Sequence, residues 1–402
     1  MIGIRVTKPY TNIKYIKKNI EKYSPYTLQD VYDASSQNKF NVISTFAGGG
    51  GSSTGYRLAG GNILCINEFV EEARNTYRDN YPNTPIIPDD IKKLSGHEFL
   101  DVANLKAGEL DVLDGSPPCA AFSMAGSVSH GKGNTHKDAF GKTKGYSDIK
   151  EVTNVEDLFF EFLRVADVIK PKVIIAENVA GLTMGEAKQY FNKIQNAFED
   201  IGYDVSAKVL NSAFFGVSQT RTRVFFIGLR NDITSAVGLT FMNIANIFPH
   251  ETNTVIPLRN ALENLEYDDN EVKELTEKFS GTAYWRDTGS KMEDNPPKVL
   301  TGANYHHKGH HFNLKRVSLE QPAPTLTAMG GGQTTAGAFH WNEPRKLTLG
   351  ELKRIQSLPD DFHLTGKWNQ RAERIGRMVP PLLLKAIADS VYEKVIKVYK
   401  EK

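Results

Sequence analysis

The feature that most constrains the fold of this 402-residue chain is an alternation of strand-like and helix-like segments between residues 41 and 230. Short apolar runs predict buried strands, and the segments between them space their apolar residues as helices do. In residues 156–170, for example, Phe159, Phe162 and Ala166 share one face of an amphipathic helix. This alternation favours the α/β class with a mainly parallel sheet.

Composition narrows the function classes that are open to the chain. Its net charge at pH 7 is +2, so any surface that binds nucleic acid must be local. Two cysteines, Cys65 and Cys119, are too few for a disulfide scaffold or a thiolate zinc site, and they fit a reducing compartment. The amino terminus lacks the apolar run of a signal peptide, and no stretch approaches a membrane span. We therefore expect a cytoplasmic protein with no membrane segment.

One cysteine follows a stiff turn. Residues 111–114 predict a short buried strand, and Pro117 and Pro118 then fix the backbone that leads to Cys119. The carboxyl end of a parallel strand is where α/β sheets bind ligands, and a thiolate is a strong nucleophile near neutral pH. A nucleophilic Cys119 is therefore one interpretation, and a buried inert thiol is the other.

A glycine-rich turn follows an earlier strand. The strand 41–46 leads into Ala47-Gly-Gly-Gly-Gly-Ser-Ser-Thr-Gly55, after which a helix begins. This order is typical of nucleotide-cofactor sites, because glycines let the backbone approach a ligand closely. The turn has neither the lysine of a P-loop nor a strict dinucleotide-binding fingerprint, so a merely flexible loop is the alternative.

Acidic residues stand at the ends of three predicted strands. Glu68 lies 22 positions after Phe46, near the spacing at which an acid meets ribose hydroxyls. Asp90 could accept a hydrogen bond from an adenine amino group, although Asp89 and Asp90 could equally be turn residues or a helix cap. Glu177 ends the strand predicted at 172–179.

Two arginines occupy alternate positions of an extended segment. In Gln219-Thr-Arg-Thr-Arg223, Arg221 and Arg223 are predicted to face the same way.

The texture of the sequence divides the chain into four parts. Residues 1–40 hold seven basic residues against three acidic ones, which suits a phosphate-contacting arm or, as we favour, a solvated helix or a strap on the main domain. A catalytic and cofactor-binding domain is expected at 41–235. A second, smaller domain is expected at 236–345, and residues 346–402 are expected to return to the first domain through a helix near Pro380.

Two polar segments stand apart from this division. The long segment 123–154 has no hydrophobic period, and we interpret it as a mobile functional loop. The histidine-rich run 305–311 has no cysteine and no recognised pattern of acids beside it. We favour an exposed polar loop or a DNA-facing hairpin over a metal site, and we predict no metal.

Taken together, these segments resemble the DNA cytosine-5 methyltransferases, and their order is the order of that family over residues 41–385. The resemblance rests on the segments Phe46-Ala-Gly-Gly-Gly-Gly51, Glu68, Asp90, Pro117-Pro-Cys119, Glu177-Asn-Val179, Gln219-x-Arg221-x-Arg223, Pro322-Ala-Pro-Thr-Leu-Thr327, Leu347 to Phe362 and Ile375-Gly-Arg-Met-Val-Pro380. Each motif alone is modest, but the ordered set is specific.

The resemblance implies a class I methyltransferase sheet that uses S-adenosyl-L-methionine and yields S-adenosyl-L-homocysteine. It also implies a small target-recognition domain, double-stranded DNA as substrate, and a target cytosine flipped out of the duplex. A monomer is expected, with a restriction endonuclease as a possible genetic partner.

Site residues carry over from the family position by position. Cys119 would add to carbon 6 of the cytosine, Glu177 would give a proton to ring nitrogen 3, and the two arginines would hold the base. Phe46 would stack on the adenine, Glu68 would hold the ribose and Asp90 the adenine amino group. The remaining cofactor contacts are expected from Ala47, Gly48, Gly49, Gly50, Gly51, Ile91 and Pro118.

The chain departs from the family pattern in three places. Ala120 replaces the usual glutamine after the cysteine, Arg377 replaces the asparagine of the last motif, and the loop after Ser123 is longer than usual. Two other functions therefore stay open: a tRNA cytosine-5 methyltransferase and a catalytically inactive DNA-binding regulator. The absence of a Cys-Phe-Thr motif argues against the first.

Overall fold

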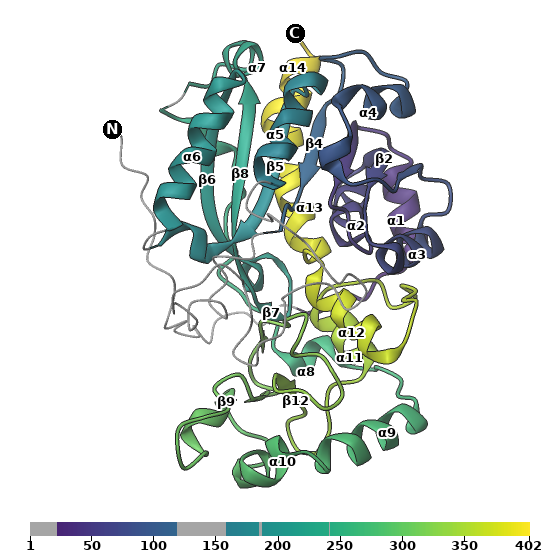
Figure 1. The fold of residues 1–402 in the computed structure, drawn as a ribbon, viewed down its shortest axis with the longest axis vertical. Coiled ribbons are helices and arrows are strands. Elements are labelled where there is room, and N and C mark those ends of the chain that lie inside the picture. The colour runs from purple at the N-terminus through teal and green to yellow at the C-terminus, as the bar shows by residue number, and fades with distance from the viewer. Residues whose placement is uncertain (1–21, 119–157, 185–186, 241) are drawn as a thin grey trace.

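The computed structural model describes residues 22–118, 158–184, 187–240 and 242–402, and its largest element is a seven-stranded sheet. The strand order is β3-β2-β1-β4-β5-β8-β6 (Figure 1). The bounds of these strands are β1 Phe40–Thr45, β2 Gly61–Asn67, β3 Ile86–Ile87, β4 Val112–Gly115, β5 Val173–Val179, β6 Tyr203–Asn211 and β8 Thr222–Arg230. Strands β1 to β5 pair in parallel, whereas β8 pairs antiparallel with both β5 and β6. The predicted α/β class is confirmed, and the antiparallel edge was not foreseen.

Side chains of this sheet alternate between two separate cores. In β5, Val173 and Ile175 join one hydrophobic cluster, while Ile174 and Ala176 join the other. A period of two residues with apolar side chains on both faces is what a sheet covered by helices on both sides requires. The continuous apolar runs that predicted these strands reflect this double burial.

Helices cover both faces of the sheet. The first face carries α1 Leu28–Ser35, α2 Gly51–Leu58 and α13 Pro381–Val391, which pack on one another. The second face carries α4 Gly96–Ala103, α5 Leu158–Ile169 and α6 Ala187–Asp200. Helix α3, Glu71–Asn80, lies beside α1 and α2 (Figure 1), and the hydroxyl of its Tyr77 donates to Oγ of Ser53 in α2. Helix α13 comes late in the chain, yet it packs on α2, which comes early in the chain, and completes the cover of the first face.

The contact between α2 and α13 depends on two glycines. A Cβ atom at Gly51 would lie 2.6 Å from the carbonyl oxygen of Val379, and one at Gly55 would lie 2.6 Å from that of Pro381. Because real Cβ atoms do not approach backbone oxygens so closely, larger residues at these positions would push α13 away. These glycines serve packing between helices as well as the turn before α2.

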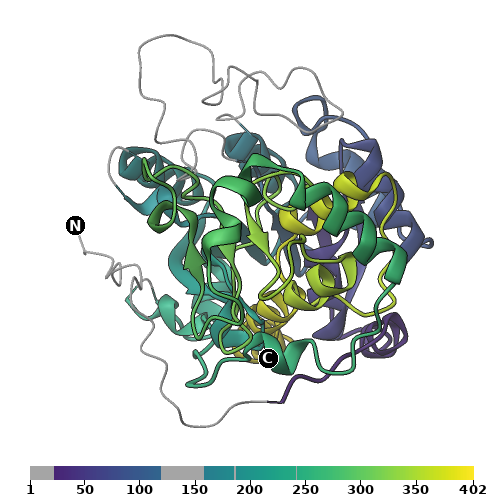
Figure 2. The ribbon, with the colours of Figure 1, turned by 90° about the horizontal axis from the view of Figure 1, so that it is seen from below.

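A smaller region lies at the far end of the molecule from α14, Lys397–Lys400 (Figure 1), and Figure 2 views the molecule from that end. Its three strands have two residues each: β9 Leu300–Thr301, β10 Lys315–Arg316 and β12 Ala338–Phe339, beside helices α9 Asp269–Ser280 and α10 Ala283–Asp287. Its apolar cluster consists of Phe279, Met292, Leu300, Leu314 and Phe339. Two further short strands, β7 Gln219–Thr220 and β11 Ala323–Pro324, pair in parallel and join this region to the large sheet.

Candidate active site

The glycine-rich turn lies between the end of β1 and the start of α2. Phe46 and Gly48 have φ angles of 52° and 57°, and Gly50 has 106°, so the backbone turns sharply in the left-handed region. Ala47 is buried, and its N–H donates to the carbonyl of Asn67 at the end of β2. A Cβ at Gly48 would meet no described heavy atom within 4 Å, so this side of the turn is open to a ligand.

Glu68 fastens this turn to the neighbouring strand. Its Oε2 accepts a hydrogen bond from the N–H of Gly48 at 2.8 Å, and its Oε1 accepts one from Val70 at 2.7 Å. Burial raises the pKa of Glu68, and the two N–H donors partly offset that rise. The acid predicted to hold a ribose thus lies at the glycine turn, at the carboxyl ends of β1 and β2.

The other predicted cofactor residues line the same edge. Asp90 caps the 3₁₀ helix η1, Ile91–Lys93, by accepting from the N–H of Lys92 at 3.0 Å, and Ile91 is buried. The capping alternative for Asp90 therefore holds in this structure. Phe69, directly after Glu68, is 52% exposed, although large aromatic side chains are usually covered. Sequence reasoning missed Phe69; its place after the acid that follows β2 was the available signal.

Glu177 and Arg223 face each other across strands β5 and β8. Nε of Arg223 lies 2.9 Å from Oε1 of Glu177, and both side chains are less than a fifth exposed. The two strands bring them together because Val179 is in register with Arg223. The N–H is not aimed at the oxygen, so the contact is an ion pair, and Oε1 accepts no hydrogen bond from any described residue. A half-satisfied carboxylate of this kind can bind a ligand donor.

The turn toward Cys119 runs beside this pair. Nδ2 of Asn178 donates to the carbonyl of Pro117 at 3.2 Å, which ties the turn to β5 next to Glu177. Pro118 is half-buried and is the last residue before the gap in the description. The predicted nucleophile Cys119 and the loop 123–154 lie outside the described residues.

Arg221 occupies a different place from Arg223. Its Nη1 donates to the carbonyls of Leu326 at 3.0 Å and of Gly376 at 2.9 Å. Burial, with Arg223 nearby, lowers the pKa of Arg221 to about 9. The two arginines, expected to face the same way onto the base, diverge because Arg221 stands in the turn between β7 and β8. Arg221 joins the late motifs to the sheet.

Asp114 is a second buried acid near Glu177. It is buried in β4, with its two oxygens 2.6 Å from Oγ of Ser44 and 3.0 Å from the hydroxyl of Tyr56. Burial, together with the charge of Glu177, raises the pKa of Asp114 to about 7.

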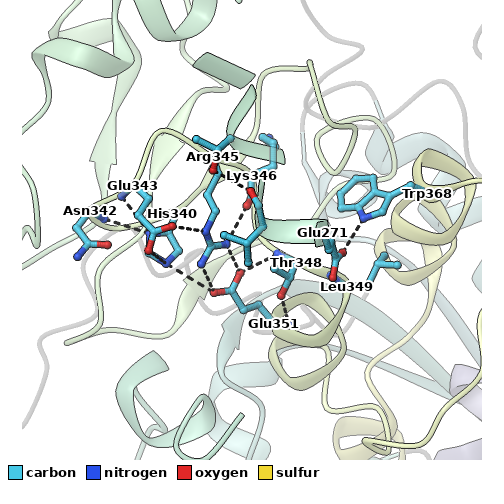
Figure 3. A network of polar contacts seen from close by, with 12 residues as sticks. Glu271, His340, Asn342, Glu343, Arg345, Lys346, Thr348, Leu349, Glu351 and Trp368 are labelled. Carbon is cyan, nitrogen blue, oxygen red and sulfur yellow. Dashed lines mark hydrogen bonds and ion pairs between the residues drawn. The ribbon is translucent and has the colours of Figure 1, made fainter. Parts of the chain in front are cut away.

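A network of charged side chains joins the small region to the large one (Figure 3). Arg345 donates to both oxygens of buried Glu351, at 2.9 and 3.1 Å, and Glu351 also accepts from the N–H of Thr348. Burial beside Arg345 lowers the pKa of His340 to about 2, so this histidine is neutral. Glu271 of α9 accepts from the indole N–H of Trp368, in α12 Trp368–Arg377, at 2.7 Å. These contacts fix how the two regions meet.

The last motif, which contains the departure Arg377, is held by contacts of Gly376 and of Arg377 itself. Gly376 lies against the chain at Thr327, where a Cβ would be 2.7 Å from the carbonyl carbon. Arg377 pairs with Glu373 at 2.8 Å along α12. Ala120 lies outside the described residues.

The described part of the chain contains neither a metal-binding cluster nor a membrane-spanning helix. No group of three or more histidine, cysteine, aspartate or glutamate side chains there is arranged to hold a metal ion. The rings of His306, His307, His310 and His311 cluster, with centroids 4.5 to 5.0 Å from that of His306, but they do not form such a group. No described helix is long and apolar enough to cross a membrane.

Comparison with known proteins supports the class that this fold and site define. The family model for the C-5 cytosine-specific DNA methylases matches residues 40–393, and the chain belongs to this family. It is 30% identical to type II methyltransferase M.Eco47II of Escherichia coli, over 91% of this chain and 82% of that one. It is 31% identical to M1.HphI of Haemophilus parahaemolyticus, over 94% and 90%.

Among solved structures, a prophage-encoded E. coli protein described as a DNA modification methyltransferase matches with a TM-score of 0.63 and 19% identity, covering 89% of this chain and 99% of that one. At that identity the likeness shows the fold alone. The chain is a DNA cytosine-5 methyltransferase that uses S-adenosylmethionine, as the ordered motifs predicted.

Proposed function

We propose that this protein methylates carbon 5 of a cytosine flipped out of a specific short duplex sequence, with Cys119 as nucleophile and Glu177 as acid. The observation that carries the proposal is the Glu177–Arg223 pair, 2.9 Å apart, beside the turn that leads to Cys119. Oε1 of Glu177 lacks a hydrogen-bond donor among the described residues, which suits a group that meets the edge of a base.

The chemistry follows from these side chains. The thiolate of Cys119 adds to carbon 6 while Glu177 gives a proton to ring nitrogen 3, and carbon 5 becomes nucleophilic. When bound, S-adenosylmethionine supplies the electrophilic methyl group. Loss of the carbon 5 proton to a base, which a water can be, then releases Cys119 and returns the ring proton to Glu177. Arg223 orients Glu177 and offers its guanidinium to the base carbonyl.

The residues at the edge formed by β1, β2 and β3 fit the cofactor. The open side of the turn at Gly48, the buried acid Glu68 and the exposed ring of Phe69 would hold, in that order, the methionine part, the ribose and the adenine. Phe46, Asp90 and Ile91 complete the adenine side, and Pro118 borders the methyl group. Arg221 has a positioning role through Leu326 and Gly376.

The small region offers a surface for DNA. Thr301 of β9 and Ala338 of β12 both pair with Lys315 of β10, so the loops 302–314 and 327–337 leave the same edge of the three-stranded sheet. Residues 295–319 and 321–342 contain no aspartate or glutamate. Loops without acidic side chains of their own, with lysine and histidines in the first loop, suit contact with a phosphate backbone and base edges.

The biological setting belongs to the same proposal. The relatives are type II methyltransferases, so we infer a monomeric modification enzyme that acts in the cytoplasm beside a restriction endonuclease. We take the small domain as residues 236–345 and the returning segment as 346–402. An RNA substrate and an inactive DNA-binding protein are the alternatives that an assay must exclude.

Bisulfite sequencing of plasmid DNA from cells that express the protein tests this function, with a Cys119→Ser variant as control. Protected cytosines within one recurring short sequence, absent with the variant, are expected. Transfer of labelled methyl groups to tRNA but not to duplex DNA would contradict the proposal. DNA binding without transfer to either would identify an inactive regulator.

A further inference from the structure

Asp114 is a buried acid that the reaction described above does not use. It lies in β4, in register with Ser44 of β1 on one side and with Ile175 of β5 on the other. Its side chain points to the face covered by α2, because the hydroxyl of Tyr56 in that helix reaches its Oδ1 at 3.0 Å. It also precedes Cys119 by five residues in the chain.

Asp114 and Glu177 lie on the same face of the sheet. Side chains two residues apart on a strand share a face, so Glu177 is on the side of Ile175, which packs in the same cluster as Val112. Val112 is two residues before Asp114. The two residues are therefore diagonal neighbours on adjacent parallel strands, with Cα atoms about 8 Å apart from the usual strand spacing and rise.

The groups around the Asp114 carboxyl determine how strongly it interacts with Glu177. Among the described residues, the groups that face it are the Ser44 hydroxyl from β1, the Tyr56 hydroxyl from α2 and, across the strand pair, Glu177 of β5 with its partner Arg223 of β8. Burial raises the pKa of Tyr56 far above its usual range, so this hydroxyl stays neutral. Only neutral donors touch Asp114 directly, and the charge closest to it in this set is another carboxylate.

We propose that Asp114 is a positioning residue for the methyl transfer: its carboxyl, on the same face of the sheet as Glu177, favours the proton on Glu177 that the cytosine ring requires. This inference rests on the proposed function of Glu177. Two neighbouring carboxylates on one face of a buried sheet resist being charged together. When Asp114 is ionised, repulsion favours the protonated form of Glu177 and thus its role as acid.

The variant Asp114→Asn separates this role from simple packing. Asparagine resembles the neutral carboxyl, so the variant and the wild type should transfer methyl groups at similar rates at pH 6. At pH 8.5, where the wild-type acid is ionised, we expect the variant to be about tenfold slower, because the alkaline limb of kcat/KM moves about one pH unit toward acid.

Asp111→Asn is the matched control. Asp111 is also buried in this segment, but it lies at the opposite end of β4, where Lys172 and Lys400 hold it at 2.8 and 2.9 Å. This control should lose stability and leave the pH profile of the rate unchanged. Tyr56→Phe, which removes one donor from Asp114 and disfavours its ionised form, should move the limb in the same direction as Asp114→Asn and less far.

Some outcomes would overturn the inference. An equal loss of rate at every pH would assign Asp114 to packing, and an unchanged profile would remove it from the reaction. If the wild-type chain transfers no methyl group at any pH, the proposed function fails, and carbon-13 NMR of the carboxyls still decides this inference. Asp114 should then titrate at lower pH in Glu177→Gln than in the wild type, and identical titration would disprove the coupling.

Discussion

The large and small regions of this enzyme are stabilised in different ways. The large sheet has strands of up to nine residues with apolar side chains in two clusters, whereas β9, β10 and β12 have two residues each. In the small region, charged side chains compensate: buried Arg316 binds the carbonyl of Trp341, and buried Lys346 binds that of Gly330. The frame that carries the chemistry rests on apolar burial, and the surface proposed for DNA rests on clamps between side chains and backbone.

This difference matters for how the two regions tolerate change. Loops held by a few clamps can change sequence between the clamped positions without disturbing a core. A fully packed sheet feels the loss of a single methylene. A constant catalytic frame and a variable recognition surface would follow from that contrast, and four substitutions test it.

The largest effect is expected from Phe226→Ala in the core of the large sheet. The Phe226 ring lies 5.1 Å from Phe191 and 5.5 Å from Phe159, between centroids, and is fully buried. The cavity should lower the free energy of unfolding by about 3–5 kcal/mol, as measured by urea denaturation. A loss below about 1 kcal/mol would mean that the apolar frame is not what stabilises this region.

Glu351→Gln should cost nearly as much at the joint between the regions. It leaves the guanidinium of Arg345 buried with only part of its charge balanced, which costs about 3 kcal/mol. Limited proteolysis should then cut the small region first. Uniform unfolding of both regions would show that the clamp stabilises the whole molecule and not the joint.

Asp114→Asn should change how stability depends on pH. The pKa of Asp114 in the folded protein is raised from 3.8 to about 7, so its contribution is fully present below pH 4 and is lost as pH rises toward 7. Thermal denaturation between pH 4.5 and 7.5 should show the variant gaining on the wild type by about 3 kcal/mol over that range. A constant difference would exclude this titration.

Lys346→Met should show the opposite dependence in the small region, with the smallest effect. Burial lowers the pKa of Lys346 from 10.5 to about 7, so its contribution is present at high pH and is lost as pH falls to 7. At pH 9.5 the free energy of unfolding of the variant should therefore be about 1 kcal/mol below that of the wild type, because the carbonyls of Gly330 and Thr335 lose their donor. This difference should disappear as the pH falls toward 7. Thermal melts at the two pH values check this.

The contrast between regions also explains what the sequence could predict. A continuous apolar run predicted β5, expected at 172–179, within a residue of its observed bounds, because burial on both faces leaves a plain pattern. The same pattern carries no direction, so the antiparallel pairing of β8 was missed. Glu68 and Glu177 were found because they follow or end such runs. Arg221 could not be placed, since its partners are the backbone carbonyls of residues far away in sequence.

The sequence predicted the small region only through a change in the kind of residues that it contains. Two-residue strands give no period, and clamps such as Lys346 look like ordinary surface lysines in the sequence. Asp114 was treated as part of a strand, because nothing local marks a carboxyl that meets Tyr56 from another element.

The glycine-mediated seating of α13 on α2 has a consequence for biosynthesis. Helix α2 follows the cofactor turn near the start of the chain, yet the surface that covers it is made of residues 381–391. During translation α2 must wait for one of the last helices, and the side that α13 covers stays exposed in between. Pairings so distant in sequence slow folding and leave intermediates exposed to aggregation and chaperones. A chain still attached to the ribosome would thus lack the packing around α2, and methylation of DNA would begin only with the completed enzyme.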